Sequence, residues 1–140
     1  MRTDREPTLN FCMGFPLFAS PLIRRPAAGI ILIVEDHLLV QITATARIED
    51  AGLSTLVADD ADEAMAILTS RDDVAAVFTD IDMPGSMDGL ALATIIRRRW
   101  PEIQVVVTSG QWPSKAAGLP DGVAFFQKPY DYSNLVNHFR

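Results

Sequence analysis

The chain has 140 residues, of which 49 % are hydrophobic, and a formal net charge of −6. This length and composition suit one globular domain with a sizeable core and exclude a disordered or fibrous chain. The acidic balance argues against a nucleic-acid-binding surface, no apolar run is long enough to cross a membrane, and the single cysteine fits a reducing compartment. We therefore expect a cytoplasmic protein without nucleic-acid or membrane partners.

The first 28 residues differ from the rest of the chain. They contain four prolines, and their apolar residues follow no regular period. The apolar stretch 9–23, with two arginines ahead of it, has some features of a secretory signal, but acidic residues among those arginines and prolines within the stretch argue against one. We expect a loosely ordered N-terminal extension over 1–28 and a folded domain over 29–140.

From residue 29 onward, short apolar runs alternate with segments of helical spacing. The runs are typical of strands buried on both faces, and they cover 30–34, 53–58, 74–78, 103–107 and 123–126. Helical spacing is found over 37–51, 61–68, 88–100 and 132–139. Prolines and glycines interrupt 111–122, so we expect the helix there to be short or absent. This alternation predicts an α/β domain in which helices cover both faces of a parallel sheet.

The first predicted helix, 37–51, is identified by apolar residues that recur at helical spacing. They are Leu38, Leu39, Ile42, Ala46 and Ile48. Gly52 follows as a stop signal, because glycine readily takes the backbone conformation that ends a helix. An amphipathic helix is therefore expected directly after the first strand.

Polar side chains at the ends of four of the five predicted strands form a candidate site. They are Glu35 and Asp36 after the first, Asp80 after the third, Thr108 after the fourth and Lys128 after the fifth. Because the carboxyl ends of parallel strands meet at one edge, we expect these groups to converge. Each also has a simpler interpretation: the acids as helix caps, the threonine as a strand-end residue, and the lysine as an exposed charge.

The chemistry of such a cluster favours a cation and phosphate. Two like charges about 4 Å apart repel by roughly 4 kcal/mol at an effective dielectric of 20, so either one acid is protonated or a cation lies among them. Carboxylates, a backbone carbonyl and waters suit Mg²⁺. An aspartate can attack phosphorus to form an acyl phosphate, with Mg²⁺, Lys128 and Thr108 each meeting one phosphoryl oxygen.

Five motifs follow one another along the predicted domain. They are Val34-Glu35-Asp36, then Thr79-Asp80-Ile81-Asp82-Met83-Pro84-Gly85, then Met87-Asp88-Gly89, then Val107-Thr108-Ser109, and finally Lys128-Pro129. In this order they resemble the receiver domain of two-component response regulators, from residue 29 to the end. The resemblance implies a flavodoxin-like, doubly wound sheet of five parallel strands in the order 2-1-3-4-5.

The resemblance also implies roles for the polar cluster. Asp80 would accept a phosphoryl group from a histidine kinase or a histidine phosphotransfer protein. Asp36, Asp80 and the main-chain carbonyl of Asp82 would bind Mg²⁺, with Glu35 in the metal's outer shell. Lys128 would contact the phosphoryl group.

Three further expectations come with the resemblance. The Lys128-Pro129 peptide would be cis. Thr108 would move toward the phosphoryl group while Phe125, on the fifth strand, turns inward as a switch, although a plain core role also suits that phenylalanine. Ser109 departs from the family pattern, since many receivers have alanine there.

The resemblance and the ending at Arg140 together suggest a stand-alone receiver. On this interpretation we expect neither a helix-turn-helix nor a catalytic output domain. The output would then be altered binding of an unknown downstream protein or phosphate shuttling, and we expect no enzymatic activity beyond phosphotransfer to Asp80 itself.

Two alternatives remain open from the sequence. Asp80-Ile81-Asp82 also resembles the nucleophile motif of haloacid-dehalogenase-like phosphatases, with Asp80 as nucleophile and Asp82 as general acid. Those enzymes carry a threonine where this chain has Pro84. The other alternative is a receiver-fold interaction module that is never phosphorylated.

Overall fold

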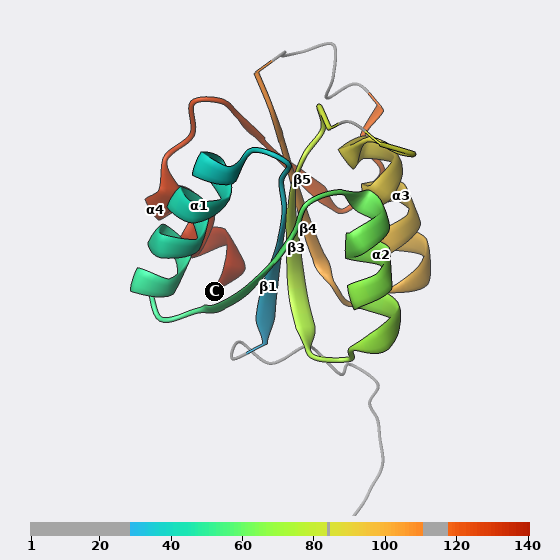
Figure 1. Ribbon diagram of the computed structural model, residues 1–140, viewed down its shortest axis with the longest axis horizontal. Coiled ribbons are helices and arrows are strands. Elements are labelled where there is room, and N and C mark those ends of the chain that lie inside the picture. Colours follow the sequence, from blue (N-terminus) through green and yellow to red (C-terminus); the bar gives the residue numbers. More distant parts are fainter. Residues whose placement is uncertain (1–28, 84, 111–117) are drawn as a thin grey trace, which may run out of the picture.

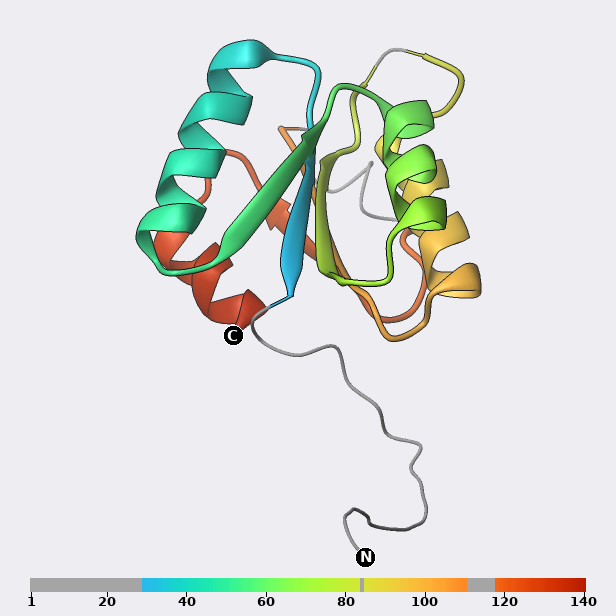
Figure 2. The same cartoon turned by 60° about the horizontal axis from the view of Figure 1, so that its bottom comes forward.

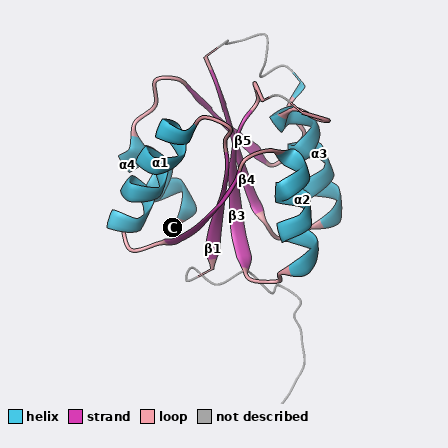
Figure 3. Cartoon of the chain, viewed as in Figure 1, coloured by secondary structure: helices cyan, strands magenta, loops and turns pink. Residues whose placement is uncertain are grey.

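The computed structural model describes residues 29–83, 85–110 and 118–140 (Figure 3). The expectation for 1–28, and most of the segment in which a short or absent helix is expected, lie outside these described residues. Within the described ranges, every helix is too short or too polar to cross a lipid bilayer.

Five parallel strands form one sheet in the order β2-β1-β3-β4-β5, which confirms the predicted topology. The strands are β1 (Ile30–Val34), β2 (Ser54–Ala58), β3 (Val74–Asp80), β4 (Gln104–Ser109) and β5 (Val123–Gln127). β3 lies in the middle, and its side chains are almost all buried. Parallel strands with both faces covered need apolar residues on both sides, which explains their continuous apolar runs.

Helices cover both faces of this sheet (Figures 1 and 2). The helices are α1 (Leu38–Asp50), α2 (Ala61–Ser70), α3 (Gly89–Arg99) and α4 (Tyr132–Phe139). α1 and α4 share one apolar core with the sheet, and α2 and α3 share the other. Because all five strands are parallel, their carboxyl ends lie at one edge of the sheet, where the residues that follow β1, β3, β4 and β5 come together.

Aspartate side chains define where three of the helices begin. Asp60 accepts a hydrogen bond from the backbone of Glu63 at 2.8 Å, and Asp88 accepts one from that of Ala91 at 2.9 Å. Asp131 caps α4 in the same manner. These bonds satisfy backbone donors that a helix leaves unpaired in its first turn. Neither of the acids after β1 caps α1, whose N-cap residue is His37.

The apolar residues that predicted α1 do not all face the core. Leu38, Leu39 and Ile42 are 65 %, 67 % and 56 % exposed, and Ala46 is exposed as well. Ile48 is buried, together with Gln41 and Ala44. The helix is thus rotated so that the stripe 41, 44 and 48 meets the sheet, because a polar member of that stripe has hydrogen-bond partners at the end of β1.

β3 is longer than its apolar run. The run ends at Phe78, but Thr79 and Asp80 continue the ladder and pair with Val107 and Thr108 of β4. A strand persists where its backbone finds partners on both sides, whatever the polarity of its side chains. Asp80 is therefore a strand residue and not the first residue of a loop.

At the amino ends of β4 and β5, Arg97 of α3 holds neighbouring loops together. Its guanidinium donates to the carbonyl oxygens of Pro101 at 2.9 Å, Ile103 at 3.4 Å and Asp121 at 3.3 Å. Gly122 lies against this group with φ +85°, and a Cβ atom there would come within 2.8 Å of the guanidinium. The close approach and the left-handed backbone both favour glycine.

Candidate functional site

Asp80 lies at the carboxyl end of the central strand with both carboxylate oxygens bonded. It is 6 % exposed. Oδ2 accepts a hydrogen bond from Lys128 Nζ at 2.6 Å, and Oδ1 accepts one from the backbone N–H of Asp82 at 2.9 Å. A short, charge-assisted bond of this kind fixes the direction of the carboxylate. The structure thus brings together two of the predicted site residues that lie 48 positions apart.

Lys128 is positioned by the end of β5. Its backbone N–H donates to Ser109 O at 3.0 Å, and the Lys128-Pro129 peptide is cis, as expected. Partial burial acts to lower the pKa of the Lys128 ammonium, but the hydrogen bond to Asp80 and the negative charges of Asp80, Glu35 and Asp82 together outweigh it, so the pKa is raised. The side chain therefore remains a cation beside Asp80.

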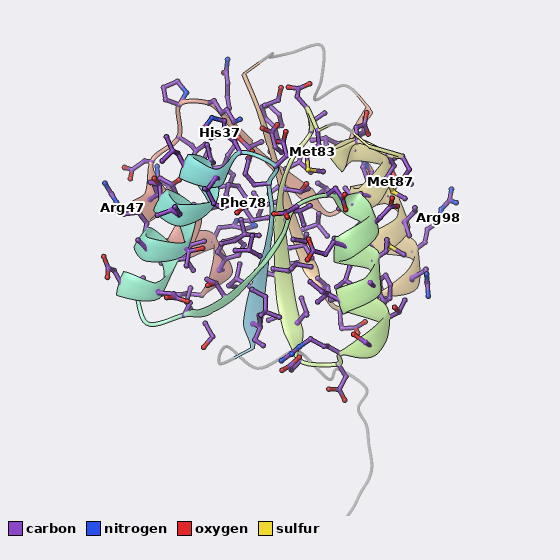
Figure 4. All side chains as sticks on the ribbon, viewed as in Figure 1. His37, Arg47, Phe78, Met83, Met87 and Arg98 are labelled. Atoms are coloured by element: carbon purple, nitrogen blue, oxygen red, sulfur yellow. The ribbon has the colours of Figure 1, made fainter. Side chains whose placement is uncertain are left out.

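Glu35 is a buried acid beside Asp80. Burial is the main cause that raises the pKa of its carboxyl group, and the charge of Asp80 and a side-chain hydrogen bond with Asp36 raise it further. The hydrogen bond from the backbone N–H of His37 to Glu35 Oε2, at 3.0 Å, acts in the opposite direction. His37 lies at the start of α1, at the same end of the sheet as Met83 of the loop after β3 (Figure 4).

The acidic groups of this network fit a divalent cation. The carboxylates of Glu35, Asp36 and Asp80 belong to it together with the Lys128 ammonium, whose single charge does not balance theirs. No three His, Cys, Asp or Glu side chains within 29–83, 85–110 and 118–140 are close enough to hold a metal ion by themselves. The donor set expected here includes a main-chain carbonyl, and Mg²⁺ commonly keeps several waters, so it needs only one or two carboxylates.

Thr108 and Ser109 approach the site from β4. Thr108 is the register partner of Asp80, but its hydroxyl donates to Phe126 O at 2.7 Å and so points to β5. Ser109 is fully buried, and its hydroxyl donates to Asp82 Oδ2 at 3.1 Å. The residue that departs from the family pattern is therefore bonded to an acid two positions beyond Asp80.

Phe125 of β5 lies near this corner of the sheet. It is half-buried and packs against the core shared by the sheet, α2 and α3. Its neighbour Phe126 packs against the opposite core. This placement is compatible with both the switch role and the plain core role, so the switch stays a prediction.

α3 begins in direct contact with the site strand. The backbone N–H of Gly89 donates to Ile81 O at 3.1 Å. A Cβ atom at Gly89 would lie 2.1 Å from the carbonyl oxygen of Asp80, far closer than any real contact. Glycine at this position is therefore what lets α3 approach the end of β3.

Gln41 is a site residue that sequence reasoning missed. It is 8 % exposed, and its amide donates to the carbonyl oxygen of Glu35 and to Asp59 Oδ1, the latter at 2.7 Å. The available signal was a polar residue that shares its helical stripe with Ala44 and Ile48. The exposed apolar residues of α1 obscured that signal, because they suggested that a different face of the helix is buried.

A hollow of about 530 Å³ adjoins Lys128 on the side of α1. It is lined mainly by apolar and aromatic side chains, namely Leu39, Val40, Pro129, Tyr130 and Tyr132, with Thr43 and Lys128. Burial raises the pKa of the Tyr130 phenol, so this ring stays neutral. Leu39 lines the hollow and is also one of the exposed apolar side chains of α1, with Leu38 and Ile42. We call the hollow together with these three side chains the α1 surface.

Comparison with known proteins agrees with this fold. Residues 31–140 match the model of the response regulator receiver domain. The nitrogen assimilation regulatory protein NtrX of Azorhizobium caulinodans is 37 % identical over 110 residues, which are 76 % of this chain and 24 % of that protein. The hydrogenase transcriptional regulatory protein HoxA of Cupriavidus necator is 32 % identical over 79 % of this chain and 23 % of its own length.

Solved structures give the same result. The receiver domain of NtrX from Brucella abortus has a TM-score of 0.69 at 32 % identity, covering 77 % of this chain and 92 % of that one. A receiver domain protein from Clostridium thermocellum, at 22 % identity and a TM-score of 0.72, shows the likeness of fold alone.

The chain belongs to the response regulator receiver family, a class of phosphoryl-accepting modules of two-component signalling. It spans about a quarter of the length of the curated relatives it matches. The family match favours the receiver over the phosphatase alternative for Asp80-Ile81-Asp82.

Proposed function

We propose that Asp80 accepts a phosphoryl group from a histidine kinase or a histidine phosphotransfer protein. The observation that carries this proposal is the fixed pair of Asp80 and Lys128, set among further acids at the carboxyl end of β3. A carboxylate can attack phosphorus only if the charge of the incoming phosphoryl oxygens is neutralised. The pair supplies a nucleophile and a cation at one place.

The chain's own residues would divide the work of transfer. The backbone N–H of Asp82 holds Asp80 Oδ1, which leaves the carboxylate oriented before the donor arrives. A carboxylate oxygen of Asp80 would form a bond to phosphorus while the phosphorus–nitrogen bond of the donor phosphohistidine breaks and the donor imidazole leaves. Lys128 Nζ, bonded to Oδ2, would move to an oxygen of the phosphoryl group once Asp80 carries the acyl phosphate. The Thr108 hydroxyl, which donates to Phe126 O in this structure, would turn toward a different oxygen of the phosphoryl group.

Mg²⁺ would be held by Asp36, Asp80 and the main-chain carbonyl of Asp82, with Glu35 in its outer shell. When bound, the ion supplies positive charge to the phosphoryl oxygens. The like charges of Glu35 and Asp80 support this assignment, because their mutual repulsion is relieved by a cation.

Phosphorylation of Asp80 would change the conformation of residues on β4 and β5, and a partner protein would recognise that change. Movement of the Thr108 hydroxyl would free Phe126 O and leave room for Phe125 to turn inward. A local change of charge is thereby coupled to a packed surface with two arrangements. The downstream partner would be a protein that binds one arrangement better.

We assign the α1 surface to the phosphodonor protein. Lys128 both lines the hollow and bonds Asp80, so a protein seated there reaches the acceptor directly. The exposed Leu38, Leu39 and Ile42 are unusually apolar for a solvent-facing helix and suit a partner that covers them.

The stand-alone arrangement and the cytoplasmic location stay predictions, as does the absence of enzymatic activity beyond phosphotransfer to Asp80. The curated relatives are about four times longer than the matched region, so the comparison with them does not support a receiver that acts alone.

The test is labelling with acetyl phosphate. The wild-type chain should take up acyl phosphate only with Mg²⁺, and the nearly isosteric Asp80→Asn should abolish the label while leaving the fold intact. Asp73→Asn is the matched control, since this exposed acid precedes the same strand at its other end. Equal labelling of wild type and Asp80→Asn would refute the assignment, and no labelling at all would favour an unphosphorylated interaction module.

A further inference from the structure

Gln41 places a buried amide between two loops of the site. It belongs to the first turn of α1, where its backbone N–H donates to His37 O at 3.0 Å. With 8 % exposure, its side chain is withdrawn from solvent, and a buried amide group needs protein partners. The identity of those partners tells what the residue does.

Both hydrogens of the Gln41 amide have partners. Nε2 donates to the carbonyl oxygen of Glu35 and to Asp59 Oδ1 at 2.7 Å. The first partner belongs to the peptide that joins Glu35 to Asp36. The second lies in the loop between β2 and α2. One side chain thus connects the loops that follow two neighbouring strands.

Two further hydrogen bonds of Glu35 help to fix the orientation of the peptide that joins it to Asp36. Its backbone N–H donates to Ala58 O at 3.0 Å, and its carboxylate accepts from the backbone of His37. The bond from Gln41 adds the third point, the carbonyl oxygen. Because a peptide group is planar, fixing this oxygen fixes the direction in which the chain continues to Asp36.

The other end of the connection is anchored to α2. The backbone N–H of Asp59 donates to Glu63 Oε1 at 2.7 Å, and Asp60 accepts from the backbone of Glu63. Asp59 is therefore held at the capped start of a helix, which gives Gln41 a firm point of attachment.

We infer that Gln41 is a positioning residue of the cation site, which holds the Glu35–Asp36 peptide so that Asp36 and Asp80 face the same Mg²⁺. The inference rests on the proposed function. Gln41 touches neither the ion nor phosphate, and it acts through the backbone that carries a ligand. Loss of such outer contacts commonly lowers metal affinity by about 10–100-fold.

The experiment is a titration of the full chain with Mg²⁺ alone, at constant ionic strength, followed by backbone amide NMR. Gln41→Met keeps the length of the side chain but removes both donors, and should raise the Kd for Mg²⁺ about tenfold or more. Gln41→Arg retains donors for both partners and should restore the affinity to within a few-fold. Gln104→Met, the same change at an exposed position at the start of β4, should bind as wild type does.

A purely structural role predicts a different pattern. Gln41→Met would then lower the urea midpoint of unfolding but leave the Kd for Mg²⁺ unchanged, and that result would overturn the inference alone. Failure of Gln41→Arg to restore affinity lost in Gln41→Met would do the same. If wild type shows no Mg²⁺ binding, or if Asp36→Asn binds equally well, the proposed function fails and the inference with it.

Discussion

Lys128 and Arg97 are two partly buried cations at opposite ends of the sheet, and they bind different kinds of partner. Lys128, at the carboxyl end, bonds the carboxylate of Asp80. Arg97, at the amino end, bonds backbone carbonyls of the loops that lead into β4 and β5. A carboxylate can change its charge by modification, whereas a carbonyl cannot. Under the proposed function, phosphorylation of Asp80 would change the first contact, whereas the second contact would keep only its role in the fold.

The same contrast applies to the glycines at the two ends. Gly89 lets α3 approach Asp80, and Gly122 lets a loop approach Arg97. Substitution at either site should destabilise the fold, but only the first should also disturb Asp80, the proposed phosphoryl acceptor.

Gly89→Ala should have the largest effect on stability. Its Cβ would lie 2.1 Å from Asp80 O, so either α3 or the end of β3 must shift. We expect a loss of about 3 kcal/mol in the free energy of unfolding, the upper end for overpacking, and slower labelling of Asp80 by acetyl phosphate. Urea denaturation and labelling measure the two effects.

Gly110→Ala is the control for that variant, because nothing lies within 4 Å of a Cβ at Gly110. It should be nearly as stable as wild type. A Gly89→Ala protein of wild-type stability would show that the approach of α3 to Asp80 is not a constraint on the site.

Gly122→Ala should have a smaller effect, confined to stability. It forces alanine to φ +85° and displaces the Arg97 guanidinium, which together should cost about 2 kcal/mol in the free energy of unfolding. Gly52→Ala shares the positive φ but has nothing within 4 Å, and should cost about 1 kcal/mol. Labelling of folded Gly122→Ala at the wild-type rate is expected, and a slower rate would contradict the separation of the two ends.

Leu39→Ser should have the smallest effect on stability and none on labelling by acetyl phosphate. The side chain is 67 % exposed, so we expect a change within about 0.5 kcal/mol in the free energy of unfolding. Transfer from a phosphohistidine protein should fall about tenfold, because Leu39 both lines the hollow and is exposed, and loss of a central apolar contact weakens binding by about that factor. Unchanged transfer from the protein donor would remove the α1 surface from the proposed docking site.

Much of the fold could be predicted from local patterns. The strand 30–34 and the helix 132–139 were predicted with their observed bounds, because one has a continuous apolar run rich in β-branched residues and the other an apolar stripe at helical spacing. The end of β3 was predicted two residues early. Its last pairs are made by Thr79 and Asp80, and their partners on β4 are not visible in the local sequence.

The candidate site divides in the same way. Parallel strands alone imply that Asp80 and Lys128 meet, and they do. The roles of Gln41 and Ser109 depend on single hydrogen bonds to residues in other loops, and neither bond follows from spacing along the chain.

The sequence by itself determined the order of strands and helices and the set of polar groups at one edge, because strand and helix periods and the direction of a parallel sheet are local or topological properties. Only the tertiary structure decided which face of α1 is buried and where each hydroxyl and amide of the site donates. Those choices depend on helix rotation and on side-chain rotamers, which are set by contacts between segments far apart along the chain.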